Sequence, residues 1–413
     1  MTATTYSADK LDTPPVTSAG RRGVLAVACG AHALHDGFTD LLYILFPIWQ
    51  AAFGLDYAAV GVLRALAAGT MAAMQVPSAW LAKRVGGALV LAVGTAIVGL
   101  AYVLAGLSAG LSTLALALVL GGVGLSTQHP IASSLVARAY DGARSRAALG
   151  TYNFAGDVGK MIVPAITASL IAWLAWRPAI SLVGGVGLAG AVVIALALNT
   201  LRKRAGHLDR PAVAEAARVP DASAVAARGG RRWFWLLFAI AVVDSATRMG
   251  FLTFLPFILK MKGAELPSVG LALALVFAGG GAGKLVCGFL GARLGVLTTV
   301  YLTEGLTAAG ILALLPLSFD ASLALLPLIG VALNGTSSVL YGTVPELVPA
   351  ARRETAFGIF YTGTIGGGAL SPIVYGRLGD TVGAIPMMAV VALVCLATIP
   401  LAVLLRPALG ARR

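Results

Sequence analysis

The chain has 413 residues, of which 58% are hydrophobic and only 11% are charged. A soluble domain of this length does not carry so little charge, so the composition indicates an integral membrane protein. The formal net charge of +13 would suit a nucleic-acid partner. The basic residues instead follow membrane topology, as described below, and we expect no nucleic-acid binding.

Apolar segments long enough to cross a bilayer as helices recur along the whole chain, whereas a β-barrel would show short alternating strands. The predicted spans are residues 24–50, 58–82, 88–107, 112–138, 146–174, 178–200, 233–259, 267–291, 296–317, 321–345, 354–376 and 383–405. Residues 1–23 are predicted to be a disordered cytoplasmic tail without a signal peptide, 201–232 a cytoplasmic linker, and 407–413 a cytoplasmic C-terminal tail. The chain is therefore predicted to be a multi-pass membrane protein.

The loops between these spans differ sharply in basic residues. Loops on the side of the two termini hold most of the Lys and Arg, including the run Arg202-Lys203-Arg204. Loops on the other side hold only Arg177, Lys260, Lys262 and Arg377. By the positive-inside rule, both termini are expected in the cytoplasm, and the protein in a bacterial-type inner (plasma) membrane.

An internal repeat divides the chain into two halves. A shift of 209 residues places Pro47 on Pro256 and Arg84-Val85-Gly86 on Arg293-Leu294-Gly295, and a shift of 208 places Gly150 on Gly358 and Pro164 on Pro372. The repeat predicts two parallel six-helix halves, residues 24–200 and 233–406. Such halves usually place a substrate site at their shared interface, near the membrane midplane.

The first span carries an unusual number of polar side chains. On a helix they fall within an arc of about 140°, and they are His32, His35, Asp36, Thr39, Asp40 and Tyr43. Ionisable groups are costly in lipid, so we expect this stripe to face a central cavity and to handle protons. The alternative is a set of hydrogen bonds between helices, which is most plausible for Asp40.

Further ionisable groups lie in later spans. Asp244 and Arg248 are one turn apart, and the repeat aligns them with His35 and Thr39 respectively. They could form a switch or a bracing ion pair. Asp157 and Lys160, in a Gly-rich stretch, are also spaced for a pair within one helix.

Two cations have no acidic partner on their own span. Arg64 and Lys284 either pair across the bundle or await an anionic substrate. Lys284 could pair with Asp244 or Asp157, and Arg64 could extend toward the membrane surface. His129 precedes Pro130, which permits a helix bend lining a cavity. Glu304 is expected in packing or an oligomer contact.

These considerations give two sets of candidate residues. The predicted proton-coupling residues are His32, His35, Asp36, Asp40, His129, Asp157 and Asp244. The predicted substrate-binding residues are Arg64, Lys160, Arg248, Lys284, Thr39, Tyr43 and Asn153. No cofactor or metal is predicted: the glycines before Lys284 resemble a phosphate loop, but Leu285 replaces the required Ser or Thr, and Cys29, Cys287 and Cys395 lack ligand spacing.

Over residues 24–406 the chain resembles the major facilitator superfamily. The segment Trp80 to Gly87 is similar to that family's Gly-x-x-x-Asp-Arg-x-Gly loop, with Lys83 in place of Asp, and Gly288 to Gly295 is its repeat copy, with Ala292 at the acidic position. Within the family, the motifs His35-Asp36, His129-Pro130 and Gly156-Asp157-Val158-Gly159 are similar to the fosmidomycin-resistance branch of drug exporters. That branch has Glu in place of Ile131 and Asn in place of Asp157.

The resemblance implies an all-α membrane protein of twelve transmembrane helices in two pseudo-symmetric six-helix bundles. It implies a secondary transporter that works by alternating access, and not an enzyme. The favoured hypothesis is proton-coupled efflux of a small organic solute or drug, with the buried cations pointing to an anionic one. The alternative is proton-coupled symport for uptake of an organic anion. The expected partners are the solute, protons and the lipid bilayer, with the chain as a monomer.

Overall fold

The computed structural model describes residues 18–140, 142–205, 230–349 and 352–409, and this part of the chain is almost entirely helical. Its fourteen helices are α1 (Ser18–Phe53), α2 (Tyr57–Val85), α3 (Gly87–Gly106), α4 (Leu111–Leu125), α5 (Gln128–Ala139), α6 (Gly142–Trp173), α7 (Trp176–Ala205), α8 (Gly230–Met261), α9 (Leu266–Leu294), α10 (Val296–Leu314), α11 (Phe319–Leu347), α12 (Arg353–Val382), α13 (Ala384–Leu396) and α14 (Thr398–Leu409). The all-α prediction is therefore confirmed.

Eleven segments of the described chain are long and apolar enough to cross a membrane. Two of them combine neighbouring helices: Leu111–Ala139 joins α4 to α5, and Ala384–Leu409 joins α13 to α14. Helix α1, with 36 residues, is not among the eleven. It has the length to cross a bilayer, but the polar residues between His32 and Asp40 lower its hydropathy.

Proline explains both helix interruptions. Proline lacks an N–H, and its ring clashes with the carbonyl four residues earlier. Helix α4 ends at Leu125, and the next residue, Ser126, is four residues before Pro130. Helix α13 ends at Leu396, four residues before Pro400. The Ser126 hydroxyl donates to the Val123 carbonyl at 2.6 Å, which partly restores the bonding lost at the first break. The bend predicted at His129-Pro130 is thus present, one turn earlier.

Helix boundaries differ from the predicted segments at the chain ends and the linker. Helix α1 begins at Ser18, inside the predicted tail, and α7 and α8 extend to Ala205 and from Gly230, inside the predicted linker. Helix α14 likewise runs to Leu409. Hydropathy predicts where the apolar segment ends, but Lys, Arg and Ala favour continued helix beyond that point. The rest of the predicted tails and linker (1–17, 206–229, 410–413) lies outside the described residues.

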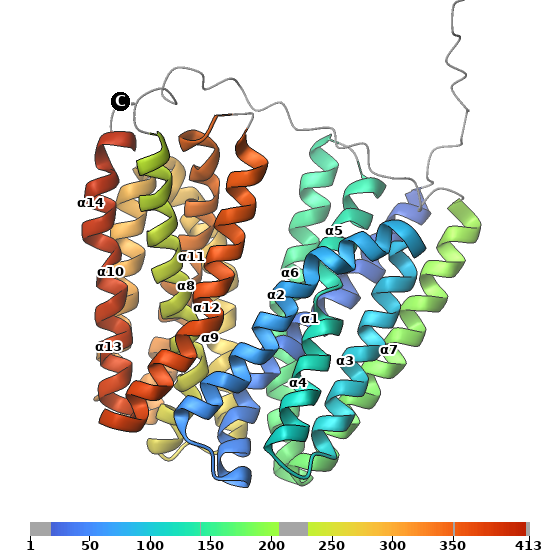
Figure 1. The fold of residues 1–413 in the computed structure, drawn as a ribbon, viewed down its shortest axis with the longest axis horizontal. Helices are drawn as coiled ribbons and strands as arrows, with labels where there is room; N and C mark the ends of the chain where they lie inside the picture. Colours follow the sequence, from blue (N-terminus) through green and yellow to red (C-terminus); the bar gives the residue numbers. More distant parts are fainter. Residues whose placement is uncertain (1–17, 141, 206–229, 350–351, 410–413) are drawn as a thin grey trace, which may run out of the picture.

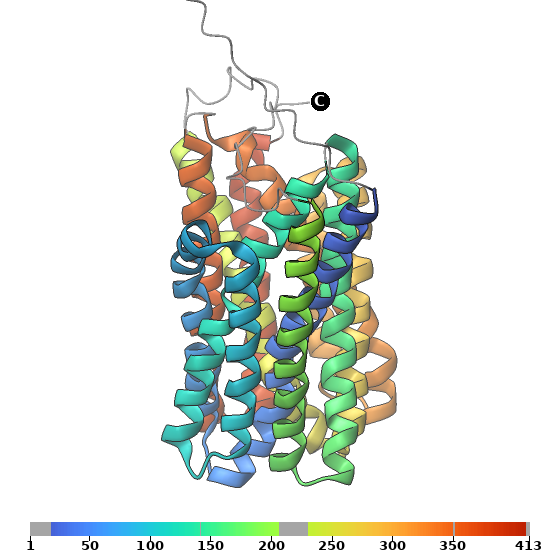
Figure 2. The ribbon, with the colours of Figure 1, turned by 90° about the vertical axis from the view of Figure 1, so that its right-hand side faces the viewer.

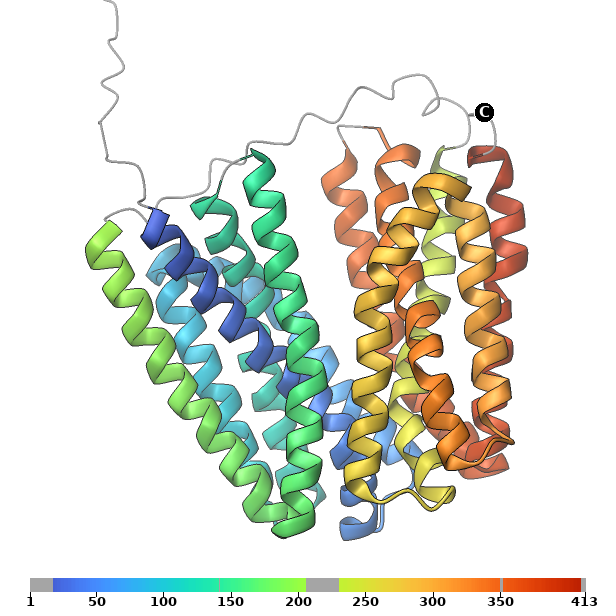
Figure 3. The ribbon, with the colours of Figure 1, turned by 180° about the vertical axis from the view of Figure 1, so that it is seen from behind.

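The helices gather in two groups, α1–α7 and α8–α14 (Figure 1). The groups converge at the end remote from the C-terminus and diverge toward it, as the view from behind also shows (Figure 3). The view along the other axis shows the helices running in a common long direction (Figure 2). One apolar cluster contains residues of both groups, among them Leu63 and Leu255, while two further clusters each lie within one group.

Contacts between α2 and α12 hold the groups together at the convergent end. A Cβ atom on Gly61 would overlap the backbone of Pro372, and one on Gly376 would overlap the backbone of Tyr57, so only glycine permits this approach. The Asp380 carboxylate of α12 accepts hydrogen bonds from the backbone N–H groups of Tyr57 (2.7 Å) and Ala58 (3.0 Å). It therefore sits at the positive N-terminus of α2.

Local structure repeats at positions 209 residues apart. Helices α2 and α9 both end at a glycine with positive φ, Gly86 (98°) and Gly295 (82°), a backbone conformation that other residues rarely adopt. The guanidinium of Arg84 lies 3.8 Å from the centre of the Trp80 ring, four residues earlier. The guanidinium of Arg293 lies 4.2 Å from the centre of the Phe289 ring, also four residues earlier. The residues that identified the internal repeat therefore also share backbone and side-chain geometry.

Candidate functional site

Four charged side chains form a continuous chain of ion pairs between the two groups of helices. Asp36 of α1 lies 3.1 Å from Lys160 Nζ of α6, and Lys160 lies 3.8 Å from Asp157 on the same helix. Lys284 of α9 donates to both carboxylate oxygens of Asp157, at 2.6 and 2.7 Å. We call Asp36, Lys160, Asp157 and Lys284 the charge chain. It joins α1 and α6 of one group to α9 of the other.

Two histidines extend the charge chain at Asp36. His32 Nε2 lies 3.3 Å from Asp36 Oδ2, and His129 Nε2 lies 3.7 Å from Oδ1. His32 Nδ1 is also 2.8 Å from the Tyr152 carbonyl, and its ring stacks on that of Tyr152. Both ring nitrogens of His32 therefore lie close to an oxygen atom, one from the backbone of α6 and one from Asp36.

Small residues on α6 make this arrangement possible. A Cβ on Gly156 would collide with the ring of His32, and one on Gly159 would overlap the backbone of Ala33. These glycines let α6 lie directly against α1, which brings Lys160 within reach of Asp36. The Gly-rich stretch identified in the sequence therefore has a direct structural role in assembling the charge chain.

The side chains of the charge chain and of the histidines beside it differ in exposure to solvent. Only 9% of the Asp36 side chain is exposed, against 42% of Lys284 and 47% of His129. Asp36 is thus buried, while Lys284 and His129, at the two ends of the arrangement, remain exposed. The half-exposed position of His129 is compatible with the cavity-lining position expected beside Pro130.

A second polar contact between the groups involves Arg64 of α2. Its Nη2 donates to the Tyr43 hydroxyl at 3.2 Å and to Met249 Sδ of α8 at 3.4 Å. Arg64 is only 4% exposed. The alternative in which Arg64 extends toward the membrane surface is therefore wrong, because the guanidinium is held in the interior by these two partners.

The polar stripe of α1 does not face a single space. His35 Nε2 is 2.8 Å from the Thr95 hydroxyl of α3, inside the α1–α7 group and away from the charge chain. The expectation of one common face is wrong for His35, because the arc is wide enough for its two edges to meet different helices. Thr39 donates to the His35 carbonyl at 3.0 Å. Asp40 is buried and has no ion pair within 4 Å in the described part of the chain.

Asp244 pairs differently from what its spacing suggests. Within the described residues it forms no ion pair with Arg248 at 4 Å or less. Its carboxyl group instead lies beside that of Glu304 on α10, and both side chains are buried.

Glu304 was expected in packing or an oligomer contact, and the structure packs it in the interior. It is 2% exposed and accepts a bond from Cys395 Sγ at 3.1 Å, so it is not at the surface and an oligomer contact is wrong. A signal was present, because threonines precede and follow it on one face, at Thr299, Thr303 and Thr307, which makes that face of the span polar.

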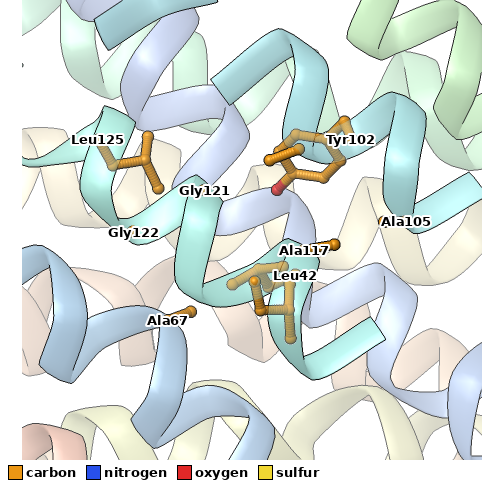
Figure 4. A pocket seen from close by; sticks show the side chains of 10 residues that line it. Leu42, Ala67, Tyr102, Ala105, Ala117, Gly121, Gly122 and Leu125 are labelled. Carbon is orange, nitrogen blue, oxygen red and sulfur yellow. The ribbon is translucent and has the colours of Figure 1, made fainter. Parts of the chain in front are cut away.

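The remaining predicted residues are less engaged. Asn153 is exposed on α6, four residues before Asp157 of the charge chain. Lys284 takes Asp157 and not Asp244 as its partner. One small cavity of about 10 Å³, room for a single water molecule, lies within the α1–α7 group and is lined by apolar residues and Tyr102 (Figure 4). None of the predicted site residues lines it.

His32, Asp36 and His129 could also offer ligand atoms to a metal ion, since these atoms lie within 4.8 Å of one another. The Lys160 ammonium is 3.1 Å from the same carboxylate. A cation already in that position competes with a metal for the negative charge. We therefore assign no metal to these residues.

Comparison with known proteins identifies the family. The model of the Major Facilitator Superfamily matches residues 28–325 and 237–412. The chain belongs to the Major Facilitator Superfamily. It is thus a multi-pass membrane transporter of small solutes and not an enzyme, as the sequence predicted.

Individual members of the superfamily resemble this chain to different degrees. SauU of Cupriavidus necator, described as a probable sulfoacetate transporter, is 26% identical over 381 residues, 88% of each chain. A bacterial homologue of the human lysosomal transporter Spinster, solved in an inward-facing and occupied conformation, has a TM-score of 0.77 at 16% identity, covering 96% of this chain and 99% of its own. The nucleoside transporter NupG has a TM-score of 0.73 at 14% identity, covering 94% and 99%. The structural matches share the fold.

Proposed function

We propose that this superfamily member is a proton-coupled secondary transporter of a small organic anion, working by alternating access. The observation that carries the proposal is the charge chain, which places two lysines and two aspartates across the boundary between the helix groups. Ionisable groups in such a position are costly unless they take part in a substrate or proton pathway. The chain offers no nucleotide-binding motif, so an ion gradient is the energy source that fits.

The proposed architecture has twelve spans, the eleven apolar ones and α1, in two six-helix halves at residues 24–200 and 233–406. The matched glycines and stacked arginines 209 residues apart support the pseudo-symmetry. The basic loops support cytoplasmic termini in a bacterial-type inner membrane. With this orientation, the two groups diverge toward the cytoplasmic side and converge on the opposite side (Figure 1). We take the monomer as the working unit.

An anionic solute is supported by the cations near the interface. Lys160 and Lys284 belong to the charge chain, Arg64 bridges α2 to α8, and Arg248 has a buried Nε without a hydrogen-bond partner. SauU adds independent support, because sulfoacetate carries a carboxylate and a sulfonate group. Thr39, Tyr43 and Asn153 remain candidate solute contacts.

Protons are the proposed coupling ion because imidazoles meet carboxylates at this site. Asp36 lies beside His32 and His129, so protons can pass between carboxylate and imidazole, and of these side chains His129 is the half-exposed one; Asp157 is a further candidate. Asp40 and Asp244 are buried carboxyl groups and are secondary candidates. His35 faces α3 and is the weakest of the predicted set.

A second candidate function is drug efflux of the fosmidomycin-resistance kind. The contact between Asp36 and His129 favours it, because it joins two motifs by which the sequence resembles that branch. Export coupled to protons requires exchange, whereas uptake requires that proton and solute move together.

Flux in liposomes tests the proposal. The purified protein is reconstituted, sulfoacetate is supplied on one side, and a pH gradient of either sign is imposed. We expect accumulation that follows the gradient and collapses with a protonophore. Flux indifferent to the gradient would contradict proton coupling, and gradient-driven transport of a cationic drug with no sulfoacetate flux would favour the second candidate.

A further inference from the structure

The Asp157 carboxylate binds the ammonium group of Lys284, the cation that links the two helix groups. Both oxygens of Asp157 accept from Lys284 Nζ, at 2.6 and 2.7 Å, while Asp157 lies further from Lys160, at 3.8 Å. Lys284 is 42% exposed, and Asp157 only 13%. An anion that approaches Lys284 therefore reaches the ammonium group from its open side and competes with Asp157 for the same N–H donors.

The charge chain is electrically balanced before any solute arrives. Its two ionised aspartates offset its two ammonium groups. An added anion alone would leave one negative charge uncompensated in a poorly hydrated interior, which is strongly unfavourable. A monoanion added together with one proton leaves the balance unchanged, and for a dianion such as sulfoacetate the proton offsets one of the two added charges.

We propose that the solute anion replaces Asp157 on Lys284, and that Asp157 takes up one proton in the same step. The proposal rests on the anionic solute class given above and adds the mechanism of coupling. The hydrogen bonds from Lys284 Nζ to the Asp157 oxygens break, and the anion accepts the Lys284 protons in their place. A proton from water forms an O–H bond on Asp157, and Lys284 keeps its own charge throughout.

The surroundings favour Asp157 over the other groups as the proton acceptor in this step. The ionisable groups that face Asp157 and Lys160 are His32, Asp36 and Asp40 of α1, His129 of α5, and Lys284 of α9. Asp36 keeps Lys160 at 3.1 Å when Lys284 leaves, so its charge stays compensated. The histidines contact Asp36 and not Asp157. Only Asp157 loses its main cation.

This exchange determines the direction of coupling for a given solute charge. Proton and anion stabilise each other on the protein, and by linkage each raises the affinity for the other. Joint binding of this kind produces symport. A cationic solute would compete with the proton for Asp157, which produces antiport. For an anion, the charge chain therefore favours the uptake mechanism over export.

The test uses the full-length protein in detergent, with sulfoacetate as the probe. Calorimetry in buffers of different ionisation enthalpy counts the protons bound per anion. We expect uptake of about one proton, and an affinity that rises about tenfold for each unit by which the pH falls while free Asp157 is ionised. Asp157→Asn should bind without proton uptake and with an affinity independent of pH. Asp320→Asn, at the exposed start of α11, removes a carboxylate elsewhere and should behave as wild type.

A measurement without ligand separates this mechanism from the solute class. Acetylation of Lys284, followed by mass spectrometry, should be faster in Asp157→Asn than in wild type, because the ammonium group loses its bidentate partner. Equal rates, or proton release on sulfoacetate binding, would overturn the exchange. Faster acetylation without sulfoacetate binding to either protein would refute the solute class and leave the control of Lys284 by Asp157 established.

Discussion

The contact between Asp380 and the start of α2 should govern how tightly the two helix groups close at the end remote from the C-terminus. Asp380→Ala removes two hydrogen bonds, from the N–H groups of Tyr57 and Ala58, and a negative charge at a helix N-terminus. Bonds to a charged acceptor contribute about 1.5–3 kcal/mol each when buried. Asp380 is exposed, so solvent screening reduces the two together to roughly 1–2 kcal/mol.

A loss of that size shifts the ratio of closed to open states about 5- to 30-fold. Hydrogen–deuterium exchange with mass spectrometry can detect it, as faster exchange at residues 57–60 and along the facing turn of α12. Asp320→Ala is the matched control, because Asp320 lies in the first turn of α11 and, within the described residues, forms no hydrogen bond or ion pair with the other group. Unchanged exchange at α2 in Asp380→Ala would refute the view that this carboxylate holds the groups together.

Two further predictions follow from close packing and from buried charge. Gly61→Ala should weaken cross-linking between α2 and α12, because the added Cβ would overlap the Pro372 backbone. Gly69→Ala on the same helix is the control: its Cβ meets no atom within 4 Å, so this variant should cross-link as wild type. Equal cross-linking of the two variants would contradict the close approach of α2 and α12. Glu304→Gln should keep thermal stability within about 1 kcal/mol of wild type, because an amide has nearly the same shape and can donate a hydrogen bond to the neighbouring Asp244. Glu304→Lys should cost roughly 3–5 kcal/mol. Unfolding of the Gln variant at the same temperature as the Lys variant would show that Glu304 is needed in its charged form.

Local spacing predicted part of the candidate site. The three-residue separation of Asp157 and Lys160 placed them on one helix face, and they do lie 3.8 Å apart. The same rule failed for Asp244 and Arg248, since a carboxyl group on α10 competes for Asp244. Spacing along a helix shows which side chains can meet, but not which neighbour from another helix will be closer.

Contacts between distant segments could be named only as alternatives. Lys284 and Asp157 are 127 residues apart, and their pairing depends on α6 and α9 meeting across the two helix groups. The sequence left Asp157 and Asp244 open as partners because both lie at similar depth in apolar spans. Fold-level prediction succeeded for a different reason: long apolar segments and an internal repeat constrain a membrane chain strongly, without requiring any particular side-chain contact.

Two of the polar contacts between the helix groups differ in how they can be broken. The Asp380 contact with α2 joins a carboxylate to backbone N–H groups and contributes roughly 1–2 kcal/mol, so a change of similar size elsewhere can offset it. The Lys284–Asp157 contact joins charged side chains, and a proton together with an anion can separate them while the proton offsets one negative charge of the anion. A ligand shifts such an equilibrium only through a difference in affinity for the two states. Exchange at Lys284 supplies that difference, because it removes the ion pair between the groups and puts in its place a solute held by one of them.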